Sequence, residues 1–227
     1  MSSIPSTMPK ATISVIITGA TGLAGSGVLR ACLGHPAVGR VTALTRRALD
    51  VRDDRLVEIV HDDFLDYSRV EDRLAGHDAC FWCLGVSSTK VRGEEYRRIT
   101  YDYTIAAAKV LERLSPGMTF CYISGAGTDE TQRSMMRWAR VKGKLEADLA
   151  LFDLEFYALR PGFIHPIKGH KGNTLLGTLL YPFIRNSRRF CVEADELGVA
   201  MINAALHPPP RHTLENADIR DLARSRP

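Results

Sequence analysis

A glycine-rich turn near the amino end constrains this chain more than any other feature. Gly19, Gly22 and Gly25 recur every third residue, directly after the apolar run Thr12–Thr18, and they open a helical pattern at Leu23–Gly34. We expect Gly19 to permit a tight turn, Gly22 to let the backbone approach a ligand, and Gly25 to let the helix pack closely on the sheet. A strand, a glycine turn and a helix in this order predict the opening unit of an α/β sheet.

The rest of the chain continues this alternation of strand and helix patterns. Strands are expected at Val41–Thr45, Leu56–Val60, Ala79–Leu84, Met118–Ser124 and Phe156–Leu159, and helices at Glu94–Leu114 and Ser134–Leu151. The alternation predicts a Rossmann fold, a doubly wound parallel sheet with helices on both faces.

The two ends of the chain lack this alternation. Residues 1–11 are rich in Ser and Pro, and we expect a disordered tail there before a single domain at 12–227. Residues 163–227 are less regular, and we expect them to contribute a small C-terminal substrate lobe. Helices are expected in this lobe near Leu175–Arg185 and Glu193–Leu206.

The glycine turn also predicts a ligand. A helix that opens on such a turn presents free N–H groups and the positive end of its dipole, which suits a phosphate group. The expected ligand is a nicotinamide dinucleotide with its pyrophosphate on the turn, whose residues are Gly19, Thr21, Gly22, Leu23 and Gly25. The alternative is that the glycines only make a tight connection between strand and helix.

The end of the second strand pattern distinguishes NADP(H) from NAD(H). An NAD site has a carboxylate there for the ribose hydroxyls, whereas a 2′-phosphate requires arginine. This chain has Arg46 and Arg47 and no acid until Asp50, so NADP(H) is expected in preference to NAD(H), unless the two arginines are simply solvated. Four residues after the next two strands are expected to border the same cofactor: Asp63, Phe64, Leu84 and Gly85.

Composition and charge exclude several other classes of protein. The 30 basic and 26 acidic residues give a net charge of +4, and the arginines are dispersed, so nucleic-acid binding is not expected. No apolar run approaches the roughly 18 residues of a membrane span. Five cysteines, an odd number, suit a reducing compartment, and no signal peptide is recognisable, so a cytoplasmic location is expected. No metal site is expected.

Six short motifs together resemble those of an atypical short-chain dehydrogenase/reductase. They are Thr18–Gly25, Thr45–Arg47, Cys83–Gly85, Ile123-Ser124, Val141–Gly143 and Arg160–Gly162. Within that superfamily the chain is most similar to the Tat-interacting-protein-like oxidoreductases, which its tail Leu214–Leu222 also resembles. The resemblance implies a cofactor cleft at the carboxyl ends of the strands, with Ser124 and Lys142 near the nicotinamide. It also implies that the backbone of four residues borders the carboxamide: Pro161, Gly162, Phe163 and Ile164.

One position departs from the superfamily pattern. Most members have a catalytic Tyr four residues before the Lys, on the same helix face, but here Trp138 precedes Lys142. An indole N–H donates a hydrogen bond yet is no practical acid near neutral pH. Trp138 could line a site whose acid is another residue, or hold a substrate oxygen while water supplies the proton, or belong to a protein without turnover; it could also be a core residue. Candidate acids are Tyr101, Tyr103, Tyr122, Tyr181 and His165, of which Tyr122 is preferred because it shares a strand face with Ser124.

The expected function follows from the cofactor and from this departure. We expect an NADP(H)-binding oxidoreductase acting on a small carbonyl or hydroxyl compound, with Ser124, Trp138, Lys142 and Tyr122 as candidate catalytic residues. The alternative is a catalytically silent redox sensor or regulatory protein. A homo-oligomer is compatible with the sequence. The basic cluster Arg185–Arg189 could contact an acidic substrate or lipid headgroups, or form a solvated face.

Overall fold

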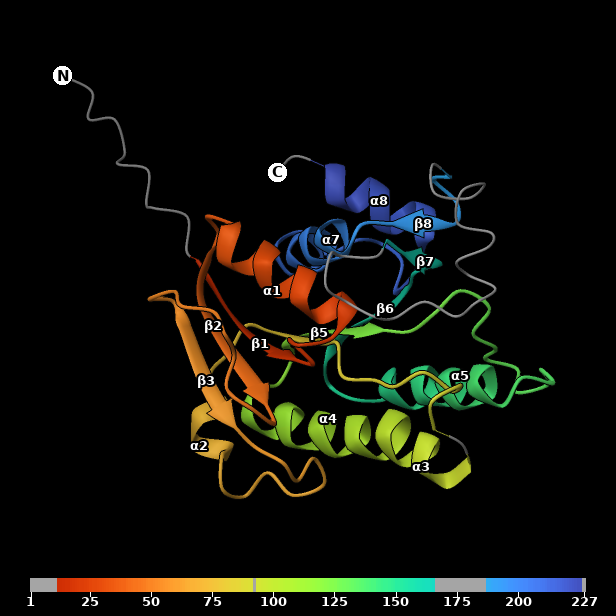
Figure 1. Ribbon diagram of the computed structural model, residues 1–227, viewed down its shortest axis with the longest axis horizontal. Helices are drawn as coiled ribbons and strands as arrows, with labels where there is room; N and C mark the ends of the chain where they lie inside the picture. Colours follow the sequence, from red (N-terminus) through yellow and green to blue (C-terminus); the bar gives the residue numbers. More distant parts are fainter. Residues whose placement is uncertain (1–11, 92, 166–186, 226–227) are drawn as a thin grey trace.

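The main sheet of the protein is parallel and has the strand order of a doubly wound fold. The computed structural model describes residues 12–91, 93–165 and 187–225. Within them, seven strands pair in the order β3-β2-β1-β4-β5-β6-β9, every pair parallel (Figure 1). The order reverses between β1 and β4, which is where such folds bind ligands. The predicted fold class is confirmed.

The strands and helices have the following bounds. The strands are β1 Ile13–Thr18, β2 Val38–Thr45, β3 Leu56–Val60, β4 Ala79–Trp82, β5 Thr119–Ile123, β6 Glu155–Arg160, β7 Phe163–Ile164, β8 Cys191–Val192 and β9 Thr213–Glu215. The helices are α1 Leu23–Gly34, α2 Glu71–Leu74, α3 Gly93–Arg97, the π-helix η1 Arg98–Asp102, α4 Tyr103–Leu114, α5 Arg137–Leu149, α7 Ala194–Leu206 and α8 Asn216–Arg224.

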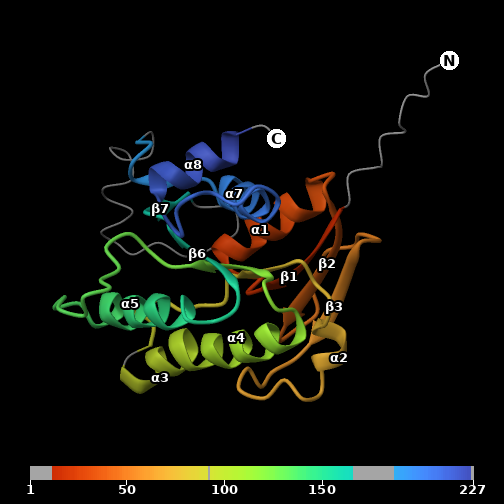
Figure 2. The same ribbon diagram turned by 180° about the vertical axis from the view of Figure 1, so that it is seen from behind.

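Helices cover both faces of the main sheet and enclose two apolar cores. Helices α1, α7 and α8 lie on one face, and α2, α4 and α5 lie on the other (Figures 1 and 2). Successive side chains of a strand point to opposite faces, so Val15 and Ile17 of β1 enter the first core while Ile16 enters the second. The burial of both faces explains why these strands are apolar runs and not alternating patterns.

The helix predicted at Glu94–Leu114 contains a π-helical turn. The structure has α3, η1 and α4 in direct succession, and the five residues Arg98–Asp102 take the wider π geometry. The apolar spacing of three and four residues does not distinguish a π turn from an α-helix, so the sequence pattern missed it.

The C-terminal residues contribute more to the main body than predicted. Strand β9 pairs with β6 as the seventh strand, and α7 packs along α1. The contact is close, because a Cβ at Gly27 would lie 2.3 Å from Ala194 Cβ. Strands β7 and β8 form a separate two-stranded sheet. The helix predicted near Leu175–Arg185 and the tail at 1–11 lie outside the described residues.

Candidate functional site

The glycine turn after β1 has less room than a methyl group at two of its three glycines. Gly19 has φ +64°, and a Cβ there would lie 2.5 Å from the Cys83 carbonyl oxygen. A Cβ on Gly25 would lie 2.1 Å from the Gly19 carbonyl oxygen, closer than real Cβ atoms come. The first turn of α1 therefore packs directly against the preceding turn. Gly25 makes room for this local contact, whereas we expected it to make room for packing of the helix on the sheet.

The amino end of α1 is open to an anion. Gly22 is its N-cap; no side chain caps the helix, and no acidic residue lies in the first turn. The Gly22 N–H donates to the Gly19 carbonyl at 2.9 Å, which closes the turn. The N–H groups of the first helical turn and the helix dipole then favour a negatively charged ligand such as a pyrophosphate.

A cavity of about 190 Å³ lies at this turn, at the carboxyl ends of β1, β2 and β4. Eight residues predicted to bind cofactor line it: Gly19, Thr21, Gly22, Arg46, Arg47, Phe64, Leu84 and Gly85. A Cβ on Gly85 would meet no atom within 4 Å, so the backbone there adjoins open space. Leu44, Thr45 and Cys83 also line the cavity and were not among the predicted site residues; their place at strand ends is the signal that could have found them.

Two of the residues predicted to border the cofactor, Asp63 and Phe64, have different surroundings. Phe64 is buried, stacks on Tyr103 with ring centroids 5.7 Å apart, and still reaches the cavity wall. Asp63 is exposed and lines a different pocket together with His61 and Arg98. The structure therefore gathers Phe64, but not Asp63, with the glycine turn.

The two arginines after β2 are exposed at the cavity. Arg46 and Arg47 both line it, and the Thr45 hydroxyl donates to the Arg47 carbonyl at 2.9 Å, which shapes the loop. A larger pocket of about 710 Å³ lies between α1 and residues 47–51, and Arg47 and Thr21 line both pockets. Arg47 therefore stands at the junction of two spaces that an adenosine phosphate could occupy.

The loop that follows β5 brings Ser124 and Trp138 into one region. The Ser124 hydroxyl lies 2.9 Å from the Thr128 hydroxyl, which donates to the Gly125 carbonyl at 2.8 Å. The Trp138 ring lies against the same loop, because a Cβ at Gly127 would be 3.7 Å from it. Thr128 was missed from the sequence, since a threonine in an irregular loop carries no recognisable signal.

Lys142 reaches from α5 to the end of β5. Its Nζ donates to the Tyr122 hydroxyl at 2.9 Å and to the Ile123 carbonyl at 3.1 Å. Burial lowers the pKa of Lys142 to about 8, although the Glu146 carboxylate opposes that shift. Tyr122 itself is buried in the core beneath α5, and burial raises its pKa well above the ordinary value. Tyr122 and Ser124 share a strand face, but on that face Tyr122 points into the core and contacts Lys142.

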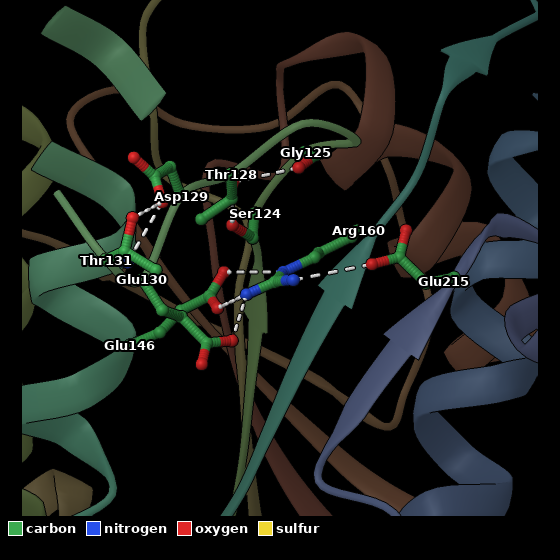
Figure 3. Close-up of polar contacts among 9 residues, drawn as sticks. All are labelled: Ser124, Gly125, Thr128, Asp129, Glu130, Thr131, Glu146, Arg160 and Glu215. Carbon is green, nitrogen blue, oxygen red and sulfur yellow. Dashed lines mark hydrogen bonds and ion pairs between the residues drawn. The ribbon is translucent and has the colours of Figure 1, made fainter. Parts of the chain in front are cut away.

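Arg160, at the end of β6, joins three elements around this region. Its guanidinium pairs with the buried Glu146 of α5 and with Glu130 of the loop, and reaches Glu215 at the end of β9 at 3.4 Å (Figure 3). Burial by itself would lower the pKa of Arg160, but Glu146 and Glu130 raise it on balance. The cluster fixes α5, and therefore Lys142 one turn away from Glu146, relative to the sheet.

The residues after Arg160 lie beside the β5 loop. The Pro161 carbonyl accepts from Ala126 N at 2.9 Å, and Gly162 N donates to the Asn216 side chain at 2.9 Å. Phe163 and Ile164 form β7 and pair with β8. These contacts hold residues 161–164 at the carboxyl end of β6. The cavity lies at the carboxyl ends of other strands of the same parallel sheet.

The other candidate acids and the basic cluster lie in varied settings. Tyr101 donates to Asp148, and the Nε2 of His165 lies 3.7 Å from a Glu193 oxygen. Tyr181 and Arg185 lie outside the described residues. Arg188 pairs with Asp221, so part of the basic cluster makes an ion pair within the chain.

The described residues contain neither a membrane-spanning helix nor a cluster of metal-ligating side chains. None of the helices in the described ranges has the length and apolar character needed to cross a membrane. No group of three or more His, Cys, Asp or Glu side chains in those ranges is arranged to hold a metal ion.

The chain matches a known family and several named relatives. The NAD(P)H-binding family model matches residues 19–179. Protein HTATIP2 of Rattus norvegicus is 29% identical over 157 residues, which are 66% of this chain and 62% of the rat protein, so the chain spans less than two thirds of that relative. The mitochondrial protein FMP52 of Eremothecium gossypii is 28% identical over 93% of this chain and 98% of its own length.

Solved structures share the fold at low identity. The enzyme WbmF of Bordetella bronchiseptica in complex with NAD⁺ has a TM-score of 0.69 at 14% identity, covering 94% of this chain and 77% of that one. A short-chain dehydrogenase family protein from Francisella tularensis has a TM-score of 0.58 at 16% identity, covering 85% of this chain and 90% of that one.

The expected cytoplasmic location is wrong by this comparison. The FMP52 relatives from Eremothecium gossypii, Saccharomyces cerevisiae, Kluyveromyces lactis and Candida albicans are named mitochondrial. An odd number of cysteines indicates a reducing environment but does not distinguish the cytoplasm from another reducing compartment, which is why composition misled.

The fold, the glycine turn and the family match agree on one assignment. The cavity lies where doubly wound folds bind dinucleotides, and the matched region includes the turn and Lys142. The chain belongs to the NAD(P)H-binding family, and its similarity to protein HTATIP2 agrees with the sequence resemblance to that group of atypical short-chain dehydrogenases/reductases.

Proposed function

We propose that the chain binds NADP(H) and uses it to interconvert a small carbonyl compound and the corresponding alcohol. The observation that carries this proposal is the Lys142 ammonium, hydrogen-bonded at the carboxyl end of β5. Ser124 follows that strand directly, and Trp138 lies one turn before Lys142 on α5. A cation, a hydroxyl and an indole N–H at one strand end suit the polarisation of a carbonyl oxygen.

The cofactor supplies the redox chemistry and the chain supplies binding and orientation. When bound, the nicotinamide provides or accepts a hydride. The amino end of α1 takes the pyrophosphate, and Gly85 leaves room for the cofactor at the end of β4. Lys142 lies beside the nicotinamide end of the cofactor, and the backbone of residues 161–164 borders the carboxamide. Residues 163–165 and 187–192 are then the described part of the substrate lobe.

Arg46 and Arg47 favour NADP(H) over NAD(H). Both are exposed at the cavity wall, and Arg47 also faces the larger pocket along α1. A forked guanidinium contact to a 2′-phosphate is charge-assisted and depends on that phosphate alone. The discrimination therefore resides in these two side chains.

Binding titrations of variants test the cofactor preference. Changing both Arg46 and Arg47 to Ala should weaken NADPH binding by about 10- to 100-fold, because a charge-assisted contact is worth about 1.5–3 kcal/mol, and should leave NADH binding unchanged. Arg52→Ala is the matched control, since Arg52 is an exposed arginine of the same loop that does not line either pocket. Equal losses for NADPH and NADH would contradict the assignment.

A catalytically silent NADP(H)-binding regulator is the second candidate, and Trp138 is the observation that favours it. The two candidates differ in what the double change Ser124→Ala and Lys142→Met removes. An enzyme loses NADPH oxidation with a panel of aldehydes and ketones, measured at 340 nm, whereas a regulator loses only affinity. Turnover that the double variant retains would contradict the catalytic assignment.

A further inference from the structure

The hydroxyl partner of Lys142 comes from the sheet and not from its own helix. Tyr122 of β5 accepts a hydrogen bond from Lys142 Nζ at 2.9 Å, and Nζ lies 4.8 Å from the centroid of the Tyr122 ring. Trp138 occupies the helix position one turn before the lysine. The lysine–phenol pair of this site is therefore formed between a strand and a helix.

Tyr122 is in no position to exchange a proton with a substrate. Its side chain is 1% exposed and lies in the core between the sheet and α5. Burial, with smaller contributions from Tyr96 and Glu146, keeps the pKa of Tyr122 well above its ordinary value. The phenol stays neutral and offers its oxygen to the ammonium.

Lys142 has a donor left for a ligand. An ammonium carries three N–H groups, and the contacts with Tyr122 and Ile123 use two of them. The residue as a whole is half-buried, and its ammonium lies at the end of β5. Ser124 and Trp138 carry the other polar groups there, and neither a hydroxyl nor an indole gives up a proton readily near neutral pH.

The charged groups around Lys142 leave its ammonium without a carboxylate of its own. Glu146 follows one turn later on α5, but both its oxygens bind Arg160 of β6, which also takes Glu130 from the loop. On the sheet side, Lys142 meets the neutral Tyr122, with Tyr96 of α3 beyond it. Burial without a direct ion pair makes the ammonium a readier proton donor, and its pKa falls to about 8.

We propose that Lys142 is the catalytic acid of this site and that Tyr122 is the positioning residue that holds it. This inference rests on the proposed oxidoreductase function and names the proton source that Trp138 cannot supply. In reduction, the carbonyl carbon gains the hydride, the π electron pair moves to the oxygen, and that oxygen takes a proton from Lys142 Nζ. The neutral amine would then regain a proton from solvent, so that the carbonyl compound, NADPH and one proton together give the alcohol and NADP⁺.

Titration of Lys142 by NMR tests the pair without any turnover. The protein is labelled with lysine carrying ¹³C at Cε, and the Lys142 signal is assigned by its loss in Lys142→Arg. The wild type should titrate near pH 8. Tyr122→Phe should lower that midpoint by about one pH unit, because the phenol oxygen no longer stabilises the charged amine. Tyr101→Phe is the matched control, since the Tyr101 hydroxyl binds Asp148 of the same helix, and should leave the midpoint unchanged.

The pH profile of reduction supplies the second readout, with NADPH and 4-nitrobenzaldehyde as the probe. The rate should be level below about pH 8 and fall tenfold per unit above it, since only protonated Lys142 donates, and the fall should begin at lower pH in Tyr122→Phe. Lys142→Arg keeps the cation but cannot give up its proton, so reduction at saturating NADPH should be at least about 100-fold slower than in the wild type.

The possible failures are distinguishable. The pairing of Lys142 with Tyr122 is overturned if the titration midpoint of Lys142 lies at the ordinary value for lysine. It is also overturned if Tyr122→Phe does not shift that midpoint. Reduction that Lys142→Arg retains overturns the acid role while the proposed function stands. No reduction by the wild type, despite NADPH binding, contradicts the proposed function and the acid role together.

Discussion

Gly25 stands where the first turn of α1 meets the glycine turn before it. The Gly19 carbonyl oxygen would lie 2.1 Å from a Cβ at this position, and both partners are backbone, so neither can move aside by a rotamer change. The same turn gives the cofactor its anion-binding amides. Stability and ligand binding are therefore coupled at a single residue.

Gly25→Ala should destabilise the protein by about 2 kcal/mol, through overpacking against backbone, and should weaken NADPH binding as the turn opens. Urea unfolding and a fluorescence titration measure the two effects. Gly34→Ala is the control, because Gly34 ends the same helix and a Cβ there meets nothing within 4 Å. That variant should be unchanged or up to about 1 kcal/mol more stable. A Gly25→Ala protein as stable as Gly34→Ala would contradict the packing argument.

The sequence predicted eight of the residues that line the cavity, because glycines and strand-end arginines carry their own signal. It did not predict the surroundings of Lys142. That Tyr122 meets Lys142, and that Thr128 meets Ser124, depends on how β5, its loop and α5 pack together. Residue type and spacing alone do not specify how these elements pack.

At the scale of elements, α5 is tied to the sheet by a buried ion pair. Glu146 is 4% exposed and Arg160 is 11% exposed, so neither charge has water to replace its partner. Removing one partner of such a pair strongly lowers the free energy of unfolding, whereas replacing both partners by apolar residues is often tolerated.

Arg160→Met should lower the free energy of unfolding by about 3–5 kcal/mol, because it leaves the Glu146 carboxylate buried and unpaired. Adding Glu146→Leu should restore part of that loss. Arg113→Met removes the exposed partner of Glu71 and should cost less than about 1 kcal/mol. Urea denaturation of the four proteins checks this. Equal losses for Arg160→Met and Arg113→Met would show that the buried pair is not structural.

The elements predicted best are those with an unbroken pattern. Helix α1 and strand β3 have the predicted bounds, since each is a clean run with turn residues on both sides. The π turn η1 preserves the apolar spacing and so leaves no trace in the pattern. Strand β9 is three residues long, and a run that short is below what alternation can reveal.

At the scale of the whole molecule, the C-terminal residues pack near the carboxyl ends of the strands, where the site lies. Strand β9 and helix α8 bury Leu214 and Ile219 in the first core. Asn216, the first residue of α8, accepts from Gly162 N and donates to the carbonyls of Arg188 and Cys191, each at 2.9 Å. One buried amide thus ties the segment after β6 to the segment before β8.

Asn216→Ala should cost about 2–3 kcal/mol, since it leaves a backbone N–H and two carbonyls without this partner. Asn203→Ala is the comparison, because Asn203 of α7 is equally buried and its amide binds the carbonyls of Leu222 and Ser225, away from Gly162. Both should destabilise, but only Asn216→Ala should speed hydrogen exchange at Gly162. Unchanged exchange there would contradict the proposed tie.

The most direct test of the central claim, that the cavity at the glycine turn binds NADP(H), is an NADPH titration of wild type and Gly85→Leu by isothermal calorimetry. A Cβ at Gly85 meets no protein atom within 4 Å, and Gly85 lines the cavity, so we expect the leucine to occupy the cavity and to leave the fold unaffected. The account predicts that wild type binds NADPH and that Gly85→Leu, with an unchanged unfolding midpoint, binds it at least about 30-fold more weakly, a loss of about 2 kcal/mol. No binding by the wild type, or equal binding by the two proteins, would contradict it.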